Sequence, residues 1–370
     1  MNLLYIFPEE FTGRFAREYH VYRLAESLAA AGCDVTLAAA PSDKLSSAED
    51  LHAFFGGTQS PRLKIAWLSR KMSLGLISIR SGAWYYKQLD RLIESARPDV
   101  VYTMHPKAAD HLAKRHPKLP LIFEAHEIFA DSHPEGSAKY GELLALERRV
   151  HAHARAVVTI SSYLADCLKE RFGVTVPMRV QHDGIDEAML LDGATAHDPR
   201  ELIYAGSLQA WKGVPVAIAA MRLLPEFHLT VLGGDGDAVE NLRRDAPANV
   251  TFHGTVTREA MRPFLAKASI GLMPNLLEPR SALYTFPLKL LEYSAAGKGI
   301  VASRIPVFDN LDVGAWTELV PSGQAEALAA GVRALAQRGM DRGAAQTWAR
   351  QFLWPKQGIA LKSFLEQVLR

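Results

Sequence analysis

The 370 residues of this chain are more than one hydrophobic core usually organises, so two domains are expected. Hydrophobic residues make up 48% of the chain and charged residues 22%, which excludes a disordered or fibrous protein, and the net charge of +2 gives no reason to expect nucleic acid as a partner. Two cysteines exclude a disulfide framework and a cysteine zinc site, and they favour the reducing cytoplasm as the setting.

The first half of the chain alternates short apolar runs with amphipathic stretches. The run at residues 3–7 is cut off by Pro8 and two glutamates, so it is too short for a signal peptide or a membrane span and predicts a buried strand. This alternation predicts a parallel sheet with crossover helices. Further strands are predicted at 35–40, 63–68, 100–104, 121–124 and 156–160, and helices at 15–31 and 83–96.

The loop after the first predicted strand has the sequence Phe-Thr-Gly-Arg at residues 11–14. Gly13 lets the backbone approach a bound group closely, and Arg14 beside it is a candidate for binding an acceptor. The simpler interpretation is an ordinary helix cap provided by Thr12.

Residues 51–89 contain six lysines or arginines and no acidic residue, interleaved with aromatic and aliphatic side chains. Such a mixture suits peripheral contact with the inner face of a membrane, which we assign to residues 62–87, or a pocket for an anionic acceptor. An ordinary solvated edge is the alternative.

Histidines follow two predicted strands, at the sheet edge where open α/β folds bind ligands. His126 is a candidate for orienting a hydroxyl or a sugar, with Glu124 or Glu127 fixing its tautomer. The alternative is a histidine that only satisfies its loop. His105 is a second candidate. His151 lies two residues from another histidine within a predicted helix, so the two point to different faces and no metal site is expected there.

The alternation restarts after the polar stretch 192–200, with strands predicted at 202–205, 229–232, 270–273 and 300–302. We therefore predict an α/β protein with two doubly wound, Rossmann-like domains facing each other across a cleft, divided between residues 184 and 200.

Two segments of the second half carry candidate ligand-binding groups. Residues 202–213 run from a strand through a glycine turn to Lys212 at the start of a helix, which is typical of a diphosphate site. In residues 286–303, Pro287 suits a first helical turn and Glu292 can bind the two hydroxyls of a ribose. Lys289 lies on the same helical face as Glu292, so it either adds a second cation or forms a surface ion pair. An ordinary amphipathic helix followed by a strand is the simpler alternative.

These segments resemble the signature of the GT-B glycosyltransferases, in particular the retaining group called family 4. In that family the first of two glutamates contacts the donor sugar and the second binds the ribose; Glu292 matches the second, and Tyr284 stands in place of the first. The family's Gly-Arg-Leu and Lys-Gly element holds the donor diphosphate; Lys212 matches, but Ser207 replaces the arginine. The resemblance extends over nearly the whole chain.

The resemblance implies a GT-B fold with an acceptor-side domain at residues 1–184, a nucleotide-sugar domain at 185–350, and a C-terminal helix at 351–370 that crosses back to the first domain. We assign His126 and Lys212 to catalysis. The binding assignments are Gly13, Ser207, Lys212 and Lys289 at the diphosphate; Glu292 at the ribose; Tyr284, Thr285, Phe286 and Pro287 at the donor sugar; His253 and Val256 at the base; and Arg14, His105 and Glu127 at the acceptor.

The predicted function is transfer of a sugar from a nucleoside-diphosphate donor to an acceptor hydroxyl with retention of configuration. No metal or other cofactor is expected, because lysines and helix ends supply the positive charge. A UDP or GDP donor is favoured, and the acceptor is a glycan, a lipid-linked molecule or a small molecule.

Three other functions stay open. Tyr284 and Ser207 depart from the family pattern, which would suit a catalytically weak partner subunit that binds a nucleotide sugar. A sugar-nucleotide epimerase or a phosphorylase would use the same architecture. A nicotinamide dehydrogenase is disfavoured, because the first predicted strand is not followed by the glycine-rich dinucleotide turn.

Overall fold

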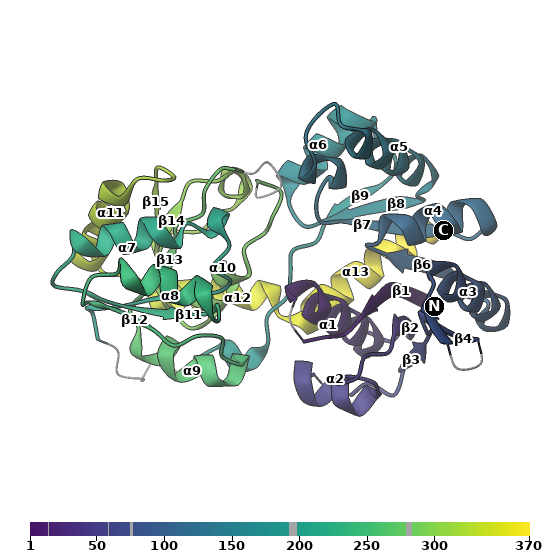
Figure 1. Ribbon diagram of the computed structural model, residues 1–370, viewed down its shortest axis with the longest axis horizontal. Coiled ribbons are helices and arrows are strands. Elements are labelled where there is room, and N and C mark those ends of the chain that lie inside the picture. The colour runs from purple at the N-terminus through teal and green to yellow at the C-terminus, as the bar shows by residue number, and fades with distance from the viewer. Residues whose placement is uncertain (14, 58, 75–76, 192–197, 279–282) are drawn as a thin grey trace. The chain divides into compact units, whose positions relative to one another are not determined.

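A computed structural model describes residues 1–13, 15–57, 59–74, 77–191, 198–278 and 283–370 (Figure 1). Arg14 therefore lies outside the described residues. The chain forms two compact units. Unit 1 consists of Met1–Gly184 together with Trp354–Arg370, and unit 2 of Ile185–Leu353.

Unit 1 is built on a parallel sheet of seven strands in the order β3-β2-β1-β6-β7-β8-β9. Helices cover such a sheet on both faces, which is why its central strands are runs of buried residues rather than alternating ones. A separate antiparallel hairpin is formed by β4 and β5. The strands are β1 Asn2–Glu10, β2 Asp34–Ala40, β3 Leu63–Trp67, β4 Lys71–Leu74, β5 Ile77–Arg80, β6 Val100–Thr103, β7 Leu121–Ala125, β8 Ala156–Thr159 and β9 Met178–Val180.

Serine side chains start four of the helices of unit 1. Ser47, Ser81, Ser137 and Ser161 each accept a hydrogen bond from a backbone N–H in the first turn, which satisfies a donor that the helix itself leaves unpaired. The helices of this unit are α1 Ala16–Ala30, α2 Ala48–Phe55, α3 Gly82–Ala96, α4 Pro106–Arg115, α5 Ala138–His153, α6 Ser162–Phe172 and α13 Trp354–Leu369.

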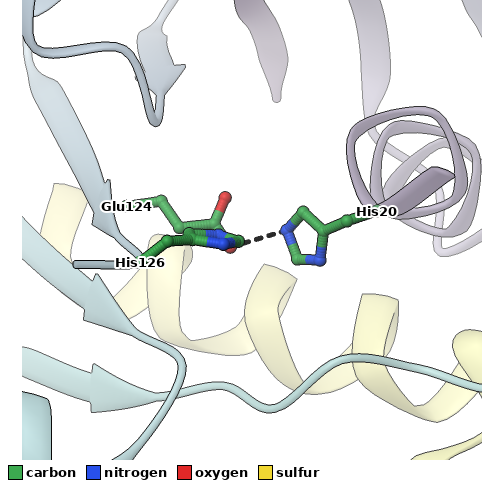
Figure 2. Close-up of side chains that lie close together, drawn as sticks. All are labelled: His20, Glu124 and His126. Carbon is green, nitrogen blue, oxygen red and sulfur yellow. Dashed lines mark hydrogen bonds and ion pairs between the residues drawn. The ribbon is translucent and has the colours of Figure 1, made fainter. Parts of the chain in front are cut away.

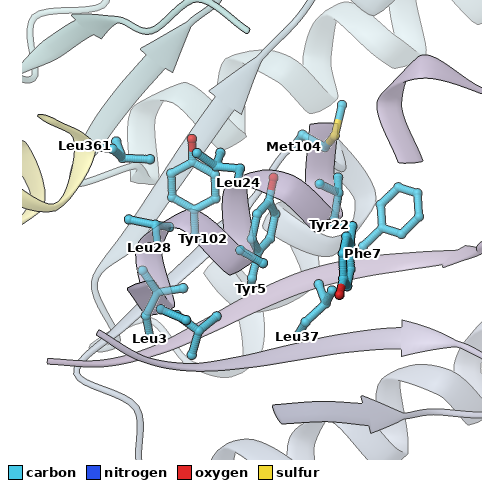
Figure 3. Close-up of a cluster of buried hydrophobic side chains, with 14 of the residues drawn as sticks. Leu3, Tyr5, Phe7, Tyr22, Leu24, Leu28, Leu37, Tyr102, Met104 and Leu361 are labelled. Carbon is cyan, nitrogen blue, oxygen red and sulfur yellow. The ribbon is translucent and has the colours of Figure 1, made fainter. Parts of the chain in front are cut away.

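The C-terminal helix α13 completes the core of unit 1. Its Leu361 joins the side chains of β1 and α1 in one buried cluster (Figure 3). α13 can pack closely on α1 because Gly358 has no side chain: a Cβ there would lie 2.3 Å from the carbonyl oxygen of Ser27. Lys362 then donates to the carbonyl of Ala31 at the end of α1. The last helix is therefore an integral part of unit 1.

Unit 2 contains a second parallel sheet, of six strands in the order β12-β11-β10-β13-β14-β15. The strands are β10 Glu201–Ala205, β11 His228–Leu232, β12 Val250–Phe252, β13 Ile270–Met273, β14 Gly299–Ser303 and β15 Thr317–Val320. The helices are α7 Val214–Arg222, α8 Asp237–Arg244, α9 Arg258–Lys267, α10 Leu288–Ala295, α11 Ala325–Arg338 and α12 Arg342–Ala349. These two sheets confirm the predicted α/β class with two doubly wound sheets.

Each sheet reverses its strand order at one point. In unit 1 the strand β1 lies between β2 and β6, and in unit 2 the strand β10 lies between β11 and β13. The loops that leave the carboxyl ends of neighbouring strands diverge at such a point, which opens the usual ligand site of this architecture. The candidate residues of both units lie in these loops or next to them.

Sequence patterns did not indicate several edge elements. The strands β9 and β15 and the β4–β5 hairpin each have only three or four residues per strand, which is too short for a clear periodicity. Among the helices of the described residues, none is both long enough and apolar enough to cross a lipid bilayer.

Candidate functional site

The loop between β10 and α7 carries Lys212 to the carboxyl edge of the second sheet. Gly213 directly after it adopts a φ of 69°, and a Cβ there would collide with the carbonyl oxygen of Pro274, so glycine is required for the loop to lie against the end of β13. The ammonium nitrogen of Lys212 lies 3.6 Å from the centroid of the Trp211 ring. This cation–π contact holds the lysine at the start of α7.

Lys289, in the first turn of α10, reaches the same loop. Its ammonium nitrogen lies 4.2 Å from the centroid of the Tyr204 ring at the end of β10. Directly after β10 comes Gly206, where a Cβ would lie 2.7 Å from that nitrogen. The glycine predicted to permit close approach of a ligand thus also makes room for a lysine.

The two lysines form an unbalanced pair of charges. In the described part of the chain, no carboxylate forms an ion pair with either ammonium group. Burial lowers the pKa of Lys212 to about 8. Burial, followed by the charge of Lys212, holds the pKa of Lys289 well below its usual value, and Glu292 offsets this only in part. An anion bound here would neutralise a positive charge that the protein leaves uncompensated.

Glu292 pairs with an arginine that the sequence did not point to. Its Oε1 lies 2.9 Å from a guanidinium nitrogen of Arg258, the first residue of α9. The alternative of a surface ion pair between Glu292 and Lys289 is therefore wrong, because Glu292 is 7% exposed and its partner is Arg258. Arg258 therefore holds one oxygen of the Glu292 carboxylate in a fixed orientation.

The helix that carries both residues begins one residue later than predicted. Pro287 is the residue before α10, with an extended ψ of 113°, rather than part of its first turn. A residue with ψ in this range is not helical, so α10 starts at Leu288. It ends at Ala295, and Gly297 with a φ of 66° turns the chain into β14 as expected.

The residues assigned to the donor sugar are mostly enclosed by unit 2. Tyr284 is 2% exposed and Phe286 4%, and the Phe286 ring packs against Phe352 with the centroids 6.0 Å apart. Pro287 is also buried, whereas Thr285 is half-buried. Of these four side chains, Thr285 has the most surface to offer a sugar.

Ser207 and the segment assigned to the base lie at the surface. Ser207 is exposed, and its carbonyl accepts a hydrogen bond of 2.6 Å from the Tyr204 hydroxyl. His253 is exposed on one side and packs on Phe264 with the ring centroids 4.7 Å apart, and Val256 is half-buried. The segment from His253 to Val256 leads directly into Arg258, which connects the assigned base contacts with Glu292.

His126 follows β7 in unit 1, as predicted, and approaches Glu124. Its Nε2 lies 3.2 Å from Oε1 of Glu124, but without the alignment of a hydrogen bond, and one fifth of the side chain is exposed. Glu124 is fully buried and accepts a hydrogen bond of 3.1 Å from the Tyr5 hydroxyl. The expectation that Glu124 orients His126 stays a prediction, now with a short contact to support it.

His20 on α1 contacts the same carboxylate oxygen as His126 (Figure 2). Its Nε2 lies 2.7 Å from Oε1 of Glu124 and its Nδ1 lies 2.5 Å from Oδ1 of Asp183. Burial on its own lowers the pKa of His20, but the two carboxylates outweigh it and raise the pKa to about 10. The ring is therefore a cation that donates both N–H groups.

The charge of His20 keeps Glu124 ionised. Burial alone would raise the pKa of Glu124, yet His20 and His126 together hold it well below the usual value. Asp183 balances the other side of the imidazolium. These four residues are called the His20 cluster below: His20, Glu124, His126 and Asp183.

The loop at Gly13 is closed by a side chain of the protein itself. The backbone N–H groups of Thr12 and Gly13 both donate to the Glu18 carboxylate, at 2.7 and 2.6 Å. The Thr12 hydroxyl donates to the other oxygen of Glu18 instead of capping α1, so the predicted helix cap is wrong. Gly13 adopts a φ of 75°, as a tight turn requires, but its N–H already has an anionic partner.

The two other described residues assigned to the acceptor differ in their surroundings. His105 is the N-cap of α4, where its Nδ1 accepts from the Ala108 N–H at 3.3 Å, and burial lowers its pKa to about 4. Its geometry is that of a neutral helix cap. Glu127 is half-buried next to His126, and burial raises its pKa.

The aromatic residues between 62 and 87 are less exposed than a membrane-binding surface requires. Trp67 packs against the core of unit 1, and Tyr85 is completely buried with its hydroxyl donating to Ala38. Trp84 is half-buried, with the Lys87 ammonium 5.9 Å from the centroid of its ring. Peripheral membrane contact stays a prediction, and residues 75–76 of this stretch lie outside the described residues.

His151 is enclosed by aromatic side chains. Its ring packs between Phe123 and Phe172, with centroid distances of 5.4 and 5.1 Å, and burial lowers its pKa to about 4. It is a neutral histidine within an aromatic cluster.

Sequence reasoning missed His20 and Arg258. His20 lies in a helix whose polar and apolar residues do not separate cleanly into two faces, and Glu18, Arg23 and Glu26 of the same helix are also buried. That mixed pattern was the available signal, because a solvent-facing helix keeps its charges on one side. For Arg258 the signal was weaker: a buried carboxylate needs a counter-charge, but nothing in the sequence indicates which one.

Each of the two units matches a known protein family. The family described as Glycosyltransferase Family 4 matches residues 18–188, and the one described as Glycosyl transferases group 1 matches residues 199–338. A glycogen synthase of Mycobacterium tuberculosis is 29% identical over 328 residues, which cover 77% of this chain and 73% of that protein.

Solved structures with the same fold cover the whole chain. The sucrose-phosphate synthase from Thermosynechococcus elongatus superposes with a TM-score of 0.76 at 17% identity, over 99% of this chain and 98% of that one. Anabaena HepE in complex with UDP superposes with a TM-score of 0.75 at 15% identity, over 99% of this chain and 100% of that one. At this level of identity the likeness establishes the fold.

Proposed function

Because the chain belongs to the family 4 type of GT-B glycosyltransferases, we propose that it transfers a sugar from a nucleoside-diphosphate donor to an acceptor hydroxyl with retention of configuration and without a metal. The observation that carries the proposal is the unbalanced pair of Lys212 and Lys289. When the bond between the anomeric carbon and the diphosphate breaks, negative charge accumulates on the departing oxygens. Two lysines that form no ion pair with a carboxylate of the described residues are suited to stabilise it.

Lys289 takes over the part of the arginine that Ser207 replaces. It comes from a different element, α10, but its ammonium group reaches the loop of Lys212 next to Gly206. The first N–H groups of α10, at whose N-terminus Lys289 stands, have no capping side chain and add a partial positive charge. These groups supply the positive charge for which other transferases use a divalent cation, so we expect full activity in the presence of a chelator.

Glu292 binds the ribose of the donor through its carboxylate, while Arg258 holds the carboxylate in place. Two hydroxyls that donate to one ionised carboxylate form charge-assisted hydrogen bonds, which are stronger than neutral ones. We favour a uridine nucleotide, since a solved relative in fold, Anabaena HepE, is a complex with UDP. A guanosine donor is the second choice to be tested.

On the acceptor side, His126 orients the hydroxyl that attacks the sugar. Its position beyond β7 and its partial exposure suit contact with a bound molecule, and Glu124 behind it is held ionised by His20. We place Glu127 beside it as a further acceptor contact. The acceptor itself is a glycan, a lipid-linked molecule or a small molecule, and the cytoplasm is the expected setting.

The test is the replacement of Lys212 by alanine, compared with Lys267→Ala as a control. Lys267 is an exposed lysine of the same unit that pairs with Glu201, so its loss removes a charge without touching the proposed site. We expect Lys212→Ala to lower kcat by about 100-fold to 1,000-fold, as the loss of one group that stabilises transition-state charge commonly does. Equal kcat values for the two variants would contradict the proposal.

A partner subunit that binds a nucleotide sugar without turnover is the second candidate, favoured by the burial of Tyr284 where the family has an acid. Calorimetry with UDP and GDP sugars, followed by a transfer assay over a panel of acceptors, separates the two functions. Binding without any transfer would favour the partner subunit. Release of an epimer from the donor alone, or a requirement for free phosphate, would identify an epimerase or a phosphorylase.

A further inference from the structure

Three metal-ligating side chains converge on the surface of unit 1, away from the residues assigned to the reaction. Asp90 belongs to α3, His111 to α4, and His116 follows the end of α4. The Nε2 atoms of both histidines lie 2.8 Å from the same oxygen of Asp90. The three ligand atoms all lie within 4.8 Å of one another. They are called the α3–α4 cluster below.

The local backbone creates this convergence. Residues five apart on a helix do not share a face, so His111 and His116 would diverge if α4 continued. α4 ends at Arg115, and His116 adopts a φ of −129° and a ψ of 53°, which turns its side chain back towards Asp90. The His111 ring is stacked on Tyr86, one turn before Asp90 in α3, with the centroids 4.5 Å apart and the planes at 18°. Two of the three ligands are thus held in position before any ion binds.

The α3–α4 cluster differs from the His20 cluster in its access and in its charge. Both ring nitrogens of His20 are already bound to carboxylates, and that side chain is 3% exposed. In the α3–α4 cluster the three side chains are each between 17% and 19% exposed, so an ion can enter from solvent. Two histidines donate to one carboxylate there through Nε2–H, and each ring has a second nitrogen, Nδ1, that can carry the proton when an ion binds at Nε2.

We propose that Asp90, His111 and His116 bind a transition-metal ion of the zinc type. Two imidazole nitrogens and one carboxylate oxygen are a common ligand set for Zn²⁺, with water in the remaining position. Binding requires that each imidazole carry its proton on Nδ1, so that the Nε2 lone pair faces the ion, and Asp90 is already the carboxylate. Mg²⁺ is not expected to bind, because it prefers oxygen ligands in an octahedral arrangement.

The ion would connect α3 to the end of α4. These helices lie on the same sheet but belong to different crossovers, so a bound ion cross-links two parts of unit 1. Arg115 opposes the ion, because its Nε lies 3.8 Å from the second oxygen of Asp90. This arginine is largely exposed, so its repulsion is screened and weakens the site without closing it.

The experiment uses the full chain, stripped of metal with a chelator and dialysed, and titrated with ZnCl₂ by calorimetry and by thermal unfolding. We expect one ion per chain, a rise in Tm of several degrees at saturation, and no effect of MgCl₂. CoCl₂ is expected to give the visible absorption of four-coordinate Co²⁺, which non-specific surface binding does not produce.

Variants test whether the ion binds at the α3–α4 cluster. We expect His116→Gln and His111→Gln each to weaken Zn²⁺ binding at least tenfold, and Arg115→Gln to strengthen it a few-fold because a like charge is removed. The control is His133→Gln, an exposed histidine of the same unit outside the cluster. No zinc binding by the full chain, or binding that the His116 variant retains at full strength, would overturn the proposal.

Discussion

The two units of this glycosyltransferase bury charge in opposite ways. In unit 1, the His20 imidazolium lies between the carboxylates of Glu124 and Asp183, so that each charge has a partner. In unit 2, the buried Lys289 and the half-buried Lys212 lie near one another without an ion-pairing carboxylate in the described part of the chain. A paired cluster compensates for its own loss of hydration, whereas an unpaired one keeps a positive potential that only a ligand can satisfy.

This difference matches the supporting role proposed for the His20 cluster and the binding role proposed for Lys212 and Lys289. Removing a member of a paired cluster leaves an uncompensated buried charge, so stability falls. Removing a member of an unpaired cluster relieves repulsion, so stability rises while function is lost. The predictions below use these opposite signs.

The largest expected effect is on the His20 cluster. His20→Asn removes the cation between two buried carboxylates and should lower the free energy of unfolding by about 3–5 kcal/mol. Urea denaturation followed by tryptophan fluorescence measures the change, with His133→Asn as a control for an exposed histidine. A loss below about 1 kcal/mol would mean that His20 is no better paired than a surface histidine.

The next effect concerns Glu292, a paired charge of the proposed donor site. Glu292→Ala removes the proposed ribose contact and leaves Arg258 without this partner, and we expect the Kd for UDP or GDP to rise by about 10-fold to 100-fold, as for hydrogen bonds to a charged group. The matched control is Glu318→Ala, a carboxylate of the same unit that pairs with Arg338. Calorimetry gives both Kd values; a Kd for the Glu292 variant within twofold of the control would remove the residue from the nucleotide site.

The third effect is a change in stability, and its sign distinguishes the Lys212 and Lys289 pair from the His20 cluster. Lys289→Met keeps an unbranched side chain of similar length but removes a buried cation without an ion-pairing partner, so we expect the free protein to gain about 1–2 kcal/mol of stability. The same variant should lose affinity for nucleoside diphosphate. Destabilisation of the free protein, with affinity unchanged, would show that Lys289 has a structural role and does not bind the donor.

The last effect, small for each pH unit, is a pH dependence of opposite sign in the two units. The raised pKa of His20 means that its stabilising contribution is complete below about 6.5 and is lost as the pH rises through about 10. The lowered pKa of Lys212 has the reverse effect, because stability rises as the pH increases from about 8 to about 10.5. Each slope is at most about 1.4 kcal/mol per pH unit for one proton.

Urea denaturation between pH 6 and pH 10 measures both slopes, with His20→Asn and Lys212→Met as the variants in which one slope each should vanish. Parallel pH profiles for the wild-type protein and the His20 variant would contradict the charged state assigned to His20. The Kd for a nucleoside diphosphate should also rise above about pH 8, because Lys212 must then take up a proton on binding.

Much of the proposed donor site could be derived from the sequence because its residues lie close together in the chain. Residues 202–213 and 286–303 each combine a strand, a glycine turn and a helix end, and local patterns of this kind indicate where a cation or a carboxylate will lie. The structure places Lys212 and Lys289 near the same loop, as the substitute role for Lys289 requires. What the pattern could not supply is the partner of Glu292, since Arg258 comes from another crossover.

The acceptor side was less accessible to sequence reasoning. His126 was identified from its place after a strand, but the cluster behind it joins α1, β7 and the last residues before unit 2, and His20 on α1 is 104 residues from Glu124 and 163 residues from Asp183. The closure of the Gly13 loop by Glu18 also escaped notice, because a carboxylate in a first helical turn is ordinary in sequence.

The sequence by itself determined the alternation of strands and helices, the two sheets and the loops at their carboxyl ends, since these follow from periodicity and from turn residues within short windows. Only the tertiary structure decided which buried charges are paired. Pairing depends on side chains from segments that are far apart in the sequence and meet only in the folded protein. A pattern within a short stretch of sequence does not indicate which side chains will meet. The balanced charge of His20 and the unbalanced charge of Lys212 and Lys289 are therefore properties of the folded units.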